Sequence, residues 1–159
     1  MNFQYAFERL LEHEGGFSDH AADPGGKTRY GVTEAVARRH GYDGDMRALP
    51  LELVRRIYRA GYWDAVRADE MPDAVRFDLF DAAVNSGPKQ AIKWLQRAAG
   101  VDDDGIIGPK TLLAARMADP HLLSRRFNAH RLRFMTDLKT WGSFGRGWAR
   151  RIASNLLGA

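Results

Sequence analysis

Apolar residues recur at intervals of three and four along most of this chain, which is the period of an amphipathic helix. The first such stretch covers residues 2–13, where Phe3, Phe7 and Leu10 share one face and a glycine pair follows. Later stretches tend to open at a proline and close at a glycine, an asymmetry typical of helix ends. The pattern predicts helices beginning near Thr33, Pro50, Pro72, Pro88, Pro109 and Pro120, and a last helix over residues 147–159.

Residues 17–32 lack this period and are rich in turn formers. The sequence DPGG at residues 23–26 is a strong turn signal, and its flanks at 17–18 and 29–32 suit short strands. The chain is therefore predicted to have a mainly α fold of the α+β class, a helical bundle with a small β-hairpin region near residues 17–32.

Composition adds limits to this fold. A length of 159 residues is that of one domain. A composition of 45% apolar and 28% charged residues is typical of a soluble globular chain. The absence of cysteine excludes disulfides and thiolate metal sites. The first ten residues lack the basic and apolar segments of a signal peptide, and no apolar run approaches the length of a membrane span, roughly 18 residues or more.

Charge is unevenly distributed along the chain. Residues 121–159 hold eight Lys or Arg and one acid, whereas residues 1–120 hold sixteen bases and nineteen acids. The basic part predicts an anionic partner: nucleic acid, lipid headgroups or a cell-wall polymer. No groove-reading motif accompanies it, so nucleic acid is not expected. The alternative is a basic face that only improves solubility.

The last segment is a candidate for binding that partner. Trp148, Ile152 and Leu156 fall on one helical face, with Arg146, Arg150 and Arg151 on other faces. This is a cationic amphipathic helix, suited to anionic outer-membrane lipid. Removal of residues 140–159 is predicted to spare activity on exposed wall and weaken killing of cells that have an outer membrane.

Glu14, Asp23 and Thr28 carry the candidate chemistry. Hydrolysis of a glycosidic bond needs one carboxyl that protonates the leaving oxygen and a second group that activates water or stabilises an oxocarbenium-like transition state. The acid must stay protonated near neutral pH, which an apolar setting favours. Glu14 ends an apolar helix and precedes Phe17, whereas Asp23 lies in a glycine-rich turn that suits an ionised group. Acids beside such turns also serve as capping or solvated groups.

The order Glu14, eight residues, Asp23, four residues, Thr28 resembles the Glu-Asp-Thr arrangement of phage-type lysozymes, in which the second gap is usually one residue longer. The wider stretch EGGFSDHAADPGGKTRYGVT resembles the signature of the glycoside hydrolase family 108 N-acetylmuramidases, found in phage endolysins and related bacterial proteins. Two downstream blocks, YRAGYWDAVRADEMP and FDLFDAAVNSGPKQAIKWLQRAAGVDDDGIIGPKTL, resemble the family's second half with its peptidoglycan-binding region. The resemblance covers roughly residues 3–118.

This resemblance implies a lysozyme-like catalytic region at 1–70 and a helical peptidoglycan-binding region at 71–159, in one compact globule. It implies cleavage of the β-1,4 bond between N-acetylmuramic acid and N-acetylglucosamine, with Glu14 as the acid and Asp23 and Thr28 at the matching positions. The shorter gap leaves the role of Thr28 open, and inverting and retaining chemistry both stay possible. The implied protein is a bacteriolytic endolysin, expected to be a monomer made in the host bacterial cytoplasm without a cleavable signal peptide and released to the cell wall.

Four further residues are candidates for binding substrate. Tyr30 matches the end of the family signature. Tyr62 and Trp63 can stack on sugar faces, although aromatic residues near helix ends are more often part of a core. Asn85 can exchange hydrogen bonds with N-acetyl groups, and the alternative role is a helix C-cap.

No metal or cofactor is expected. The five histidines form no HExxH pattern, DDDG at 102–105 lacks the spacing of an EF-hand loop, and GKT at 26–28 lacks the upstream glycine of a P-loop. The resemblance makes the turn at 104–108 a structural part of the wall-binding region. Two alternatives stay open on the same substrate: a lytic transglycosylase, which needs an acid but no activated water, and a non-catalytic wall-binding protein.

Overall fold

The computed structural model describes residues 1–13 and 27–158, which fall into two compact units. One unit is Asn2–Gly61, and the other is Tyr62–Ala159 together with Met1. Glu14 and Asp23 lie outside the described residues. The described chain is mainly helical with one small antiparallel sheet, so the predicted fold class is confirmed.

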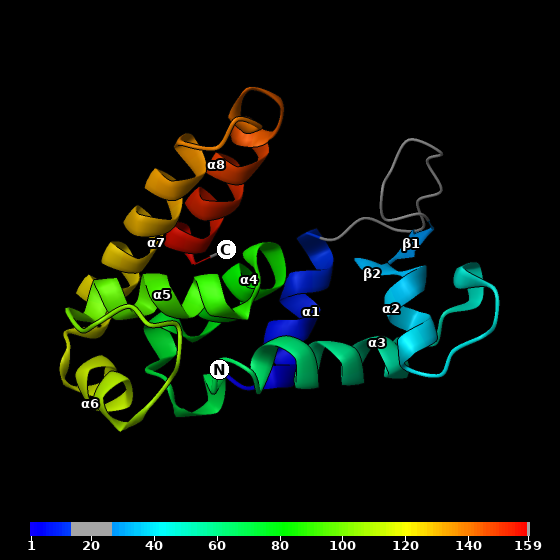
Figure 1. The fold of residues 1–159 in the computed structure, drawn as a ribbon, viewed down its shortest axis with the longest axis horizontal. Coiled ribbons are helices and arrows are strands. Elements are labelled where there is room, and N and C mark those ends of the chain that lie inside the picture. Colours follow the sequence, from blue (N-terminus) through cyan, green and yellow to red (C-terminus); the bar gives the residue numbers. More distant parts are fainter. Residues whose placement is uncertain (14–26, 159) are drawn as a thin grey trace. The chain divides into compact units, whose positions relative to one another are not determined.

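The described residues of the first unit form three α-helices and the hairpin (Figure 1). Its elements are α1 (Phe3–His13), β1 (Thr28–Arg29), β2 (Val32–Thr33), α2 (Glu34–Arg39), the 3₁₀ turn η1 (Met46–Ala48) and α3 (Leu51–Tyr58). Helix α1 is amphipathic as predicted, because Phe3, Ala6, Phe7 and Leu10 are buried. Thr33 caps α2, since its hydroxyl accepts a hydrogen bond of 3.3 Å from the Val36 amide.

The hairpin occupies only the end of the region predicted for it. Thr28 pairs with Thr33 and Arg29 pairs with Val32, so both strands fall within residues 28–33. The turn residues Tyr30 and Gly31 have φ of 51° and 72°, and two successive positive φ values are the pattern of a type I′ turn. The other predicted strand, at 17–18, lies outside the described residues.

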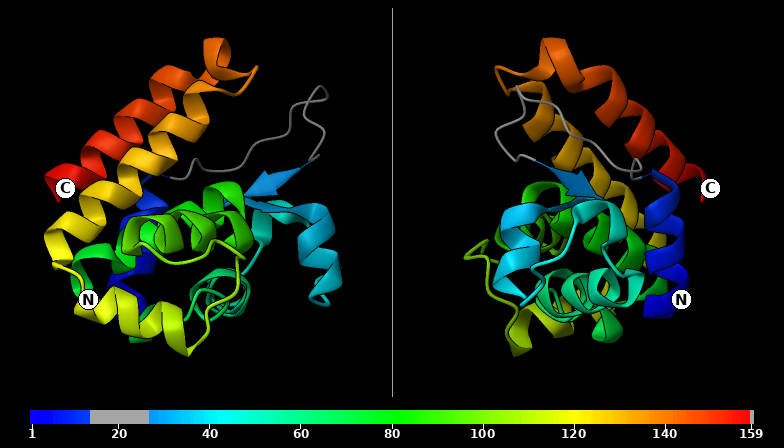
Figure 2. Two further views of the ribbon diagram at one scale, coloured as in Figure 1. Left: turned by 60° about the vertical axis from the view of Figure 1, so that its left-hand side comes forward. Right: turned by 90° about the vertical axis from the view of Figure 1, so that its right-hand side faces the viewer.

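The second unit is a helical bundle centred on α4. Its elements are η3 (Ala68–Glu70), α4 (Asp73–Ser86), α5 (Pro88–Ala99), α6 (Pro109–Met117), α7 (Pro120–Thr136) and α8 (Trp141–Leu157). Helices α4, α5 and α7 contact one another, α6 lies on α5 and α7, and α8 runs beside α7 (Figures 1 and 2). A π-helical turn, η2 (Arg59–Trp63), continues α3 and leads from the first unit into the second.

Prolines and glycines set the helix ends here, as predicted. Pro88 opens α5 directly after Gly87, whose φ is 84°, and Gly100 ends it with φ of 73°. Both glycines thus take backbone conformations that side chains disfavour, as glycines at helix ends commonly do. None of the helices in the described part of the chain combines the length and apolar character that a membrane crossing requires.

Helix α8 differs from its prediction. It begins at Trp141, earlier than expected, and its inward face is Gly145, Ile152 and Asn155. Ile152 is only 2% exposed, so the predicted stripe of Trp148, Ile152 and Leu156 is not a continuous surface. The sequence pattern places Arg151 away from the core, but its guanidinium bonds to the fully buried carboxylate of Asp81.

Candidate active site

One buried tyrosine connects the elements that precede and follow the candidate segment, residues 14–27. Tyr58, at the end of α3, packs edge to face against Phe7 of α1, with ring centroids 5.6 Å apart. Its hydroxyl donates a hydrogen bond of 2.9 Å to the main-chain carbonyl of Tyr30 in the hairpin turn. Tyr58 is buried and Tyr30 is half-buried, so this bond is only partly exposed to water and is stronger than a fully exposed one. The end of α1, which directly precedes Glu14, and the hairpin that carries Thr28 therefore belong to one packed framework.

Thr28 lies on β1 opposite Thr33 and is half-buried. The preceding residue, Lys27, accepts a hydrogen bond of 2.9 Å at its carbonyl from the amide of Glu34, the first residue of α2. Strand pairing and the α2 N-terminus thus fix the backbone on both sides of Thr28. The backbone therefore sets the position from which the Thr28 side chain extends, as a group that positions water requires.

Tyr30 sits in an uncommon backbone conformation for a residue with a side chain. Its φ of 51° is in the left-handed region. That region costs about 1–2 kcal/mol for a non-glycine residue, and the bond from Tyr58 offsets part of this cost. The Arg29 guanidinium lies 5.0 Å from the Tyr30 ring centroid, and its Nη2 donates to the Tyr30 hydroxyl at 3.3 Å. The Tyr30 side chain is therefore oriented by a cation–π contact and a hydrogen bond from its neighbour.

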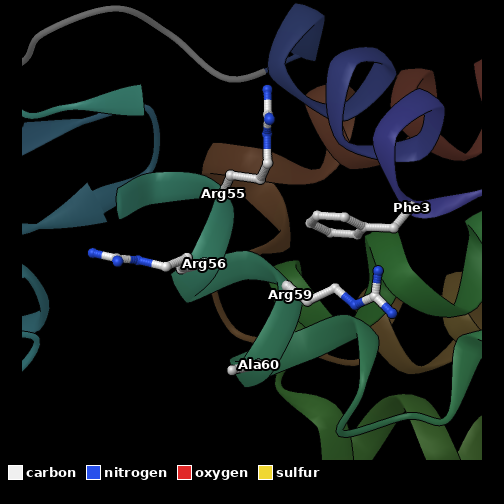
Figure 3. A pocket seen from close by; sticks show the side chains of 5 residues that line it. All are labelled: Phe3, Arg55, Arg56, Arg59 and Ala60. Atoms are coloured by element: carbon white, nitrogen blue, oxygen red, sulfur yellow. The ribbon is translucent and has the colours of Figure 1, made fainter. Parts of the chain in front are cut away.

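A pocket of about 530 Å³ opens in the same unit beside the start of α1 (Figure 3). Phe3, Arg55, Arg56, Arg59 and Ala60 line it. In Figure 3 the Phe3 ring reaches between Arg55 and Arg59, and Arg56 points to the opposite side. The Arg59 guanidinium lies 5.1 Å from the Phe3 ring centroid, whereas Arg55 pairs with Glu52 at 3.0 Å. The pocket thus offers an apolar wall with cationic groups at its rim, which suits a ligand that carries carboxylates.

The remaining sequence candidates belong to the second unit. Trp63 has no exposed surface and packs edge to face against Phe80 of α4, with centroids 5.4 Å apart. This burial leaves no ring face for a sugar, so the stacking role predicted for Trp63 is replaced by a core role. Tyr62 keeps partial exposure. Asn85 is exposed on the last turn of α4, and the capping residue is Gly87, whose amide bonds to the Ala83 carbonyl.

Sequence reasoning missed a buried charge cluster that joins α4, α7 and α8. Asp81 accepts hydrogen bonds of 2.7 Å from Arg131 and from Arg151, and one of 3.1 Å from Asn155. Burial alone would raise the pKa of the Asp81 carboxyl, but the two arginines outweigh burial and hold its pKa below the ordinary value. The available signal was a pair of acids, Asp78 and Asp81, spaced three apart among the apolar residues 77–84.

Asp78 shows the opposite electrostatics one turn earlier. Its Oδ2 accepts hydrogen bonds from the Ser124 hydroxyl at 2.7 Å and from the Asn128 amide at 2.8 Å. Burial raises the pKa of the Asp78 carboxyl, and these two bonds only partly oppose that rise. Both acids bind protein side chains within the core, so their evident role is to join helices.

The acidic turn after α5 is structural, as the resemblance implies. The Gln96 amide donates to Asp104 Oδ1 at 2.7 Å and to the Ile106 carbonyl at 3.0 Å, and its oxygen accepts from the Gly105 amide at 2.8 Å. The bond from Gln96, with one from the Ile106 amide, holds the pKa of Asp104 below its usual value. Within the described residues, no group of three or more His, Cys, Asp or Glu side chains is arranged to hold a metal ion.

A family model described as glycosyl hydrolase 108 matches residues 7–87, about half of the chain. The chain belongs to this family. In this family member a second model, described as a predicted peptidoglycan domain, matches residues 90–153. The chain is also similar to a solved structure of Brucella abortus SagA, with 36% sequence identity, coverage of 98% of this chain and 91% of that one, and a TM-score of 0.87. A search of curated proteins found no match.

The two matched regions make this glycosyl hydrolase 108 member a glycoside hydrolase that acts on peptidoglycan. They meet between α4 and α5, whereas the two compact units meet at residues 61 and 62. Helix α4 therefore belongs to the hydrolase match in sequence and to the second unit in packing. The division into regions 1–70 and 71–159 stays a prediction.

Proposed function

We propose that this protein is an N-acetylmuramidase that cleaves the β-1,4 bond between N-acetylmuramic acid and N-acetylglucosamine. Glu14 protonates the glycosidic oxygen, Asp23 stabilises developing positive charge or orients water, and Thr28 assists with its hydroxyl. Water completes the reaction by adding to the anomeric carbon, so the products are a reducing sugar and a free hydroxyl on the leaving sugar.

The observation that carries this proposal is the framework on both sides of the catalytic signature. Glu14 directly follows α1, whose Phe7 packs on Tyr58, and Tyr58 holds the turn that follows Thr28. Catalytic groups must be held within a fraction of an ångström of their working positions, which packed elements achieve better than isolated loops. The family match over residues 7–87 covers the same segment and supports the same assignment.

The arginine-rimmed pocket supports an anionic substrate in the same unit. The peptide stems of peptidoglycan carry carboxylates, and guanidinium groups bind carboxylates through paired hydrogen bonds. Arg59, whose guanidinium lies beside the Phe3 ring at this pocket, is the residue best placed to meet such a group.

The test is product analysis after digestion of purified peptidoglycan by wild-type protein and by Glu14→Gln. Loss of a general acid lowers turnover by about 10²- to 10⁴-fold, so the variant should release almost no fragments. The matched control is Glu12→Gln, which removes an exposed carboxylate two residues earlier on α1 and should keep wild-type turnover.

Mass spectrometry separates the proposal from its alternatives. Reducing N-acetylmuramic acid ends support hydrolysis, anhydro ends indicate a lytic transglycosylase, and absence of fragments indicates a non-catalytic binder. Wild-type turnover by Glu14→Gln would remove Glu14 from the mechanism.

The biological setting is part of the proposal. A bacteriolytic endolysin made in the host cytoplasm would act on the wall as a monomer after release, with exposed basic side chains of the C-terminal part near anionic lipid headgroups and α8 not inserted. Lysis assays on cells with and without an intact outer membrane, and the oligomeric state in solution, check these points.

A further inference from the structure

Three aromatic residues form an exposed cluster at the start of α8. We call Trp141, Phe144 and Trp148 the α8 aromatic patch. The Phe144 and Trp148 rings stack at 5.8 Å, and the Trp141 and Trp148 rings lie 6.2 Å apart. Phe144 is 57% exposed, and both tryptophans keep partial exposure. In Figures 1 and 2 this end of the α7–α8 pair, drawn in orange, stands away from α4, α5 and α6 of the same unit.

The backbone under the patch is shaped to hold one of its rings. A Cβ added at Gly145 would clash with Cδ2 of the Trp141 indole, so the indole rests directly on the helix backbone. Glycine inside a helix is less favourable than alanine. Glycine at position 145 therefore lowers helix stability and leaves room for the Trp141 indole against the helix backbone. The Trp141 indole lies at a half-exposed site and not in the core.

The C-terminal part of the chain that carries this patch is basic. Two of the eight basic residues beyond position 120, Arg131 and Arg151, bind Asp81 and are occupied in the core. The six others are all exposed, against the single exposed acid Asp137: Arg125, Arg126, Arg133, Lys139, Arg146 and Arg150. An exposed aromatic surface with this charge is complementary to a polymer that combines sugar faces with carboxylates.

We infer that the α8 aromatic patch is the glycan-contacting surface of the peptidoglycan-binding region. The aromatic rings lie against the carbon-bound hydrogens of sugar rings, and Arg146 and Arg150 meet the carboxylates of the peptide stems. This inference rests on the proposed action on peptidoglycan and names the surface that holds the polymer while another part of the chain cleaves it.

A membrane is the competing occupant, and burial argues against it. Insertion at a lipid surface requires a continuous apolar helix face. On α8 this face is interrupted at Ile152, which is 2% exposed, and the next exposed apolar residues, Leu156 and Leu157, lie at the opposite end of the helix. The exposed rings alone form a short platform, which is enough for one or two sugars.

Sedimentation with purified, insoluble peptidoglycan measures the binding directly and needs no cleavage. Phe144→Ala should lower affinity about three- to tenfold, the effect expected from loss of one aromatic contact. Phe144→Trp should restore binding, and Arg146→Glu should weaken it with a reduced dependence on salt. Leu113→Ala is the matched control, because Leu113 is 63% exposed on α6 of the same unit and should leave binding unchanged.

The outcomes are separable from those of the proposed function. Unchanged sedimentation of both Phe144→Ala and Arg146→Glu would overturn the inference, even if Glu14→Gln abolishes hydrolysis. Flotation with vesicles that contain anionic lipid, lost in Phe144→Ala while sedimentation with peptidoglycan is kept, would assign the patch to membrane and also overturn it. Weaker sedimentation with an unchanged rate on short soluble glycan fragments supports the inference, because such fragments need no second contact.

Discussion

The hydroxyl of Tyr58 donates a 2.9 Å hydrogen bond to the carbonyl of Tyr30, which lies 28 residues earlier in the chain. This bond joins a buried helix end to a turn that holds a non-glycine residue at positive φ. The same tyrosine ring touches Phe7 of α1. The Tyr58 side chain therefore contacts both the helix that precedes Glu14 and the hairpin that carries Thr28, and it helps to fix their relative position.

Tyr58→Phe removes this bond and keeps the ring. The carbonyl of Tyr30 loses its buried donor, so the free energy of unfolding should fall by about 1 kcal/mol in urea denaturation. Turnover of peptidoglycan should also fall, since the hairpin is less well fixed. Tyr42→Phe is the control: it removes an exposed hydrogen bond of 2.7 Å from the half-buried Tyr42 to the Asp45 carbonyl, and should leave turnover unchanged. Equal turnover in both variants would show that the hairpin keeps its position without Tyr58.

Asp81→Asn should destabilise the second unit strongly. The substitution removes the carboxylate that pairs with Arg131, which has no exposed surface, and breaking a buried pair typically costs about 3–5 kcal/mol. Asp103→Asn removes one partner of an ion pair with Arg97, and the Arg97 and Asp103 side chains are 43% and 39% exposed. Loss of such a surface pair should change stability little. Chemical denaturation of the two variants measures the difference. A similar small effect in both would mean that the buried cluster contributes no more than a surface pair.

The stability of the fold should depend on pH through Asp78. Because the folded-state pKa of Asp78 is raised, the native protein binds this proton more readily than the unfolded chain, and the contribution of Asp78 to stability falls as pH rises through the folded pKa. Asp78→Asn keeps a carbonyl oxygen for Ser124 and Asn128 and removes the titration. The variant should therefore be more stable relative to wild type at pH 7 than at pH 4, measured as the free energy of unfolding in urea. A difference that does not change with pH would contradict this. Asp137→Asn, on the exposed turn after α7, is the matched control.

Two glycines of α8 provide a matched pair of alanine substitutions. At Gly145 the new Cβ meets the Trp141 indole and must displace it, whereas at Gly147 it meets open space. Gly147→Ala should raise the free energy of unfolding by up to about 1 kcal/mol through helix propensity. Gly145→Ala should be less stable than Gly147→Ala and should shift the tryptophan fluorescence, since the indole leaves the helix surface. The same fluorescence and stability in both variants would mean that Trp141 does not rest on Gly145.

Local signals in the sequence identify the elements whose causes are local. The predicted helix after Pro88 begins and ends where its proline and Gly100 place it, and Thr33 caps α2 through its own side chain. The sequence also predicts a hairpin close to the observed one, but the strong DPGG signal gives no indication of the turn at Tyr30 and Gly31. A tyrosine at positive φ is unfavourable by itself and is stabilised by Tyr58, a distant residue that no local pattern connects to it.

Long-range packing decides the features that the sequence does not reveal. Trp63 and Tyr62 are neighbours in the chain, yet the indole of Trp63 is enclosed by the second unit, including Phe80. Arg131 and Asp81 are 50 residues apart, so neither helical period nor charge spacing relates them. The bond from Arg151 to the same carboxylate explains why a C-terminal segment that looks like a detachable cationic helix in sequence contributes to the core.

The cluster around Asp81 also limits how this enzyme can be shortened. Three side chains donate hydrogen bonds to Asp81 in the described structure: Arg131, Arg151 and Asn155. A truncation at residue 140 removes the last two and keeps Arg131. The truncation would affect the folding of the second unit as well as contact with the cell wall or membrane. A loss of bacterial killing could therefore not be assigned to the absence of residues 140–159 alone. For engineering, α8 is better treated as a structural part of the second unit, with substitutions confined to its exposed side chains.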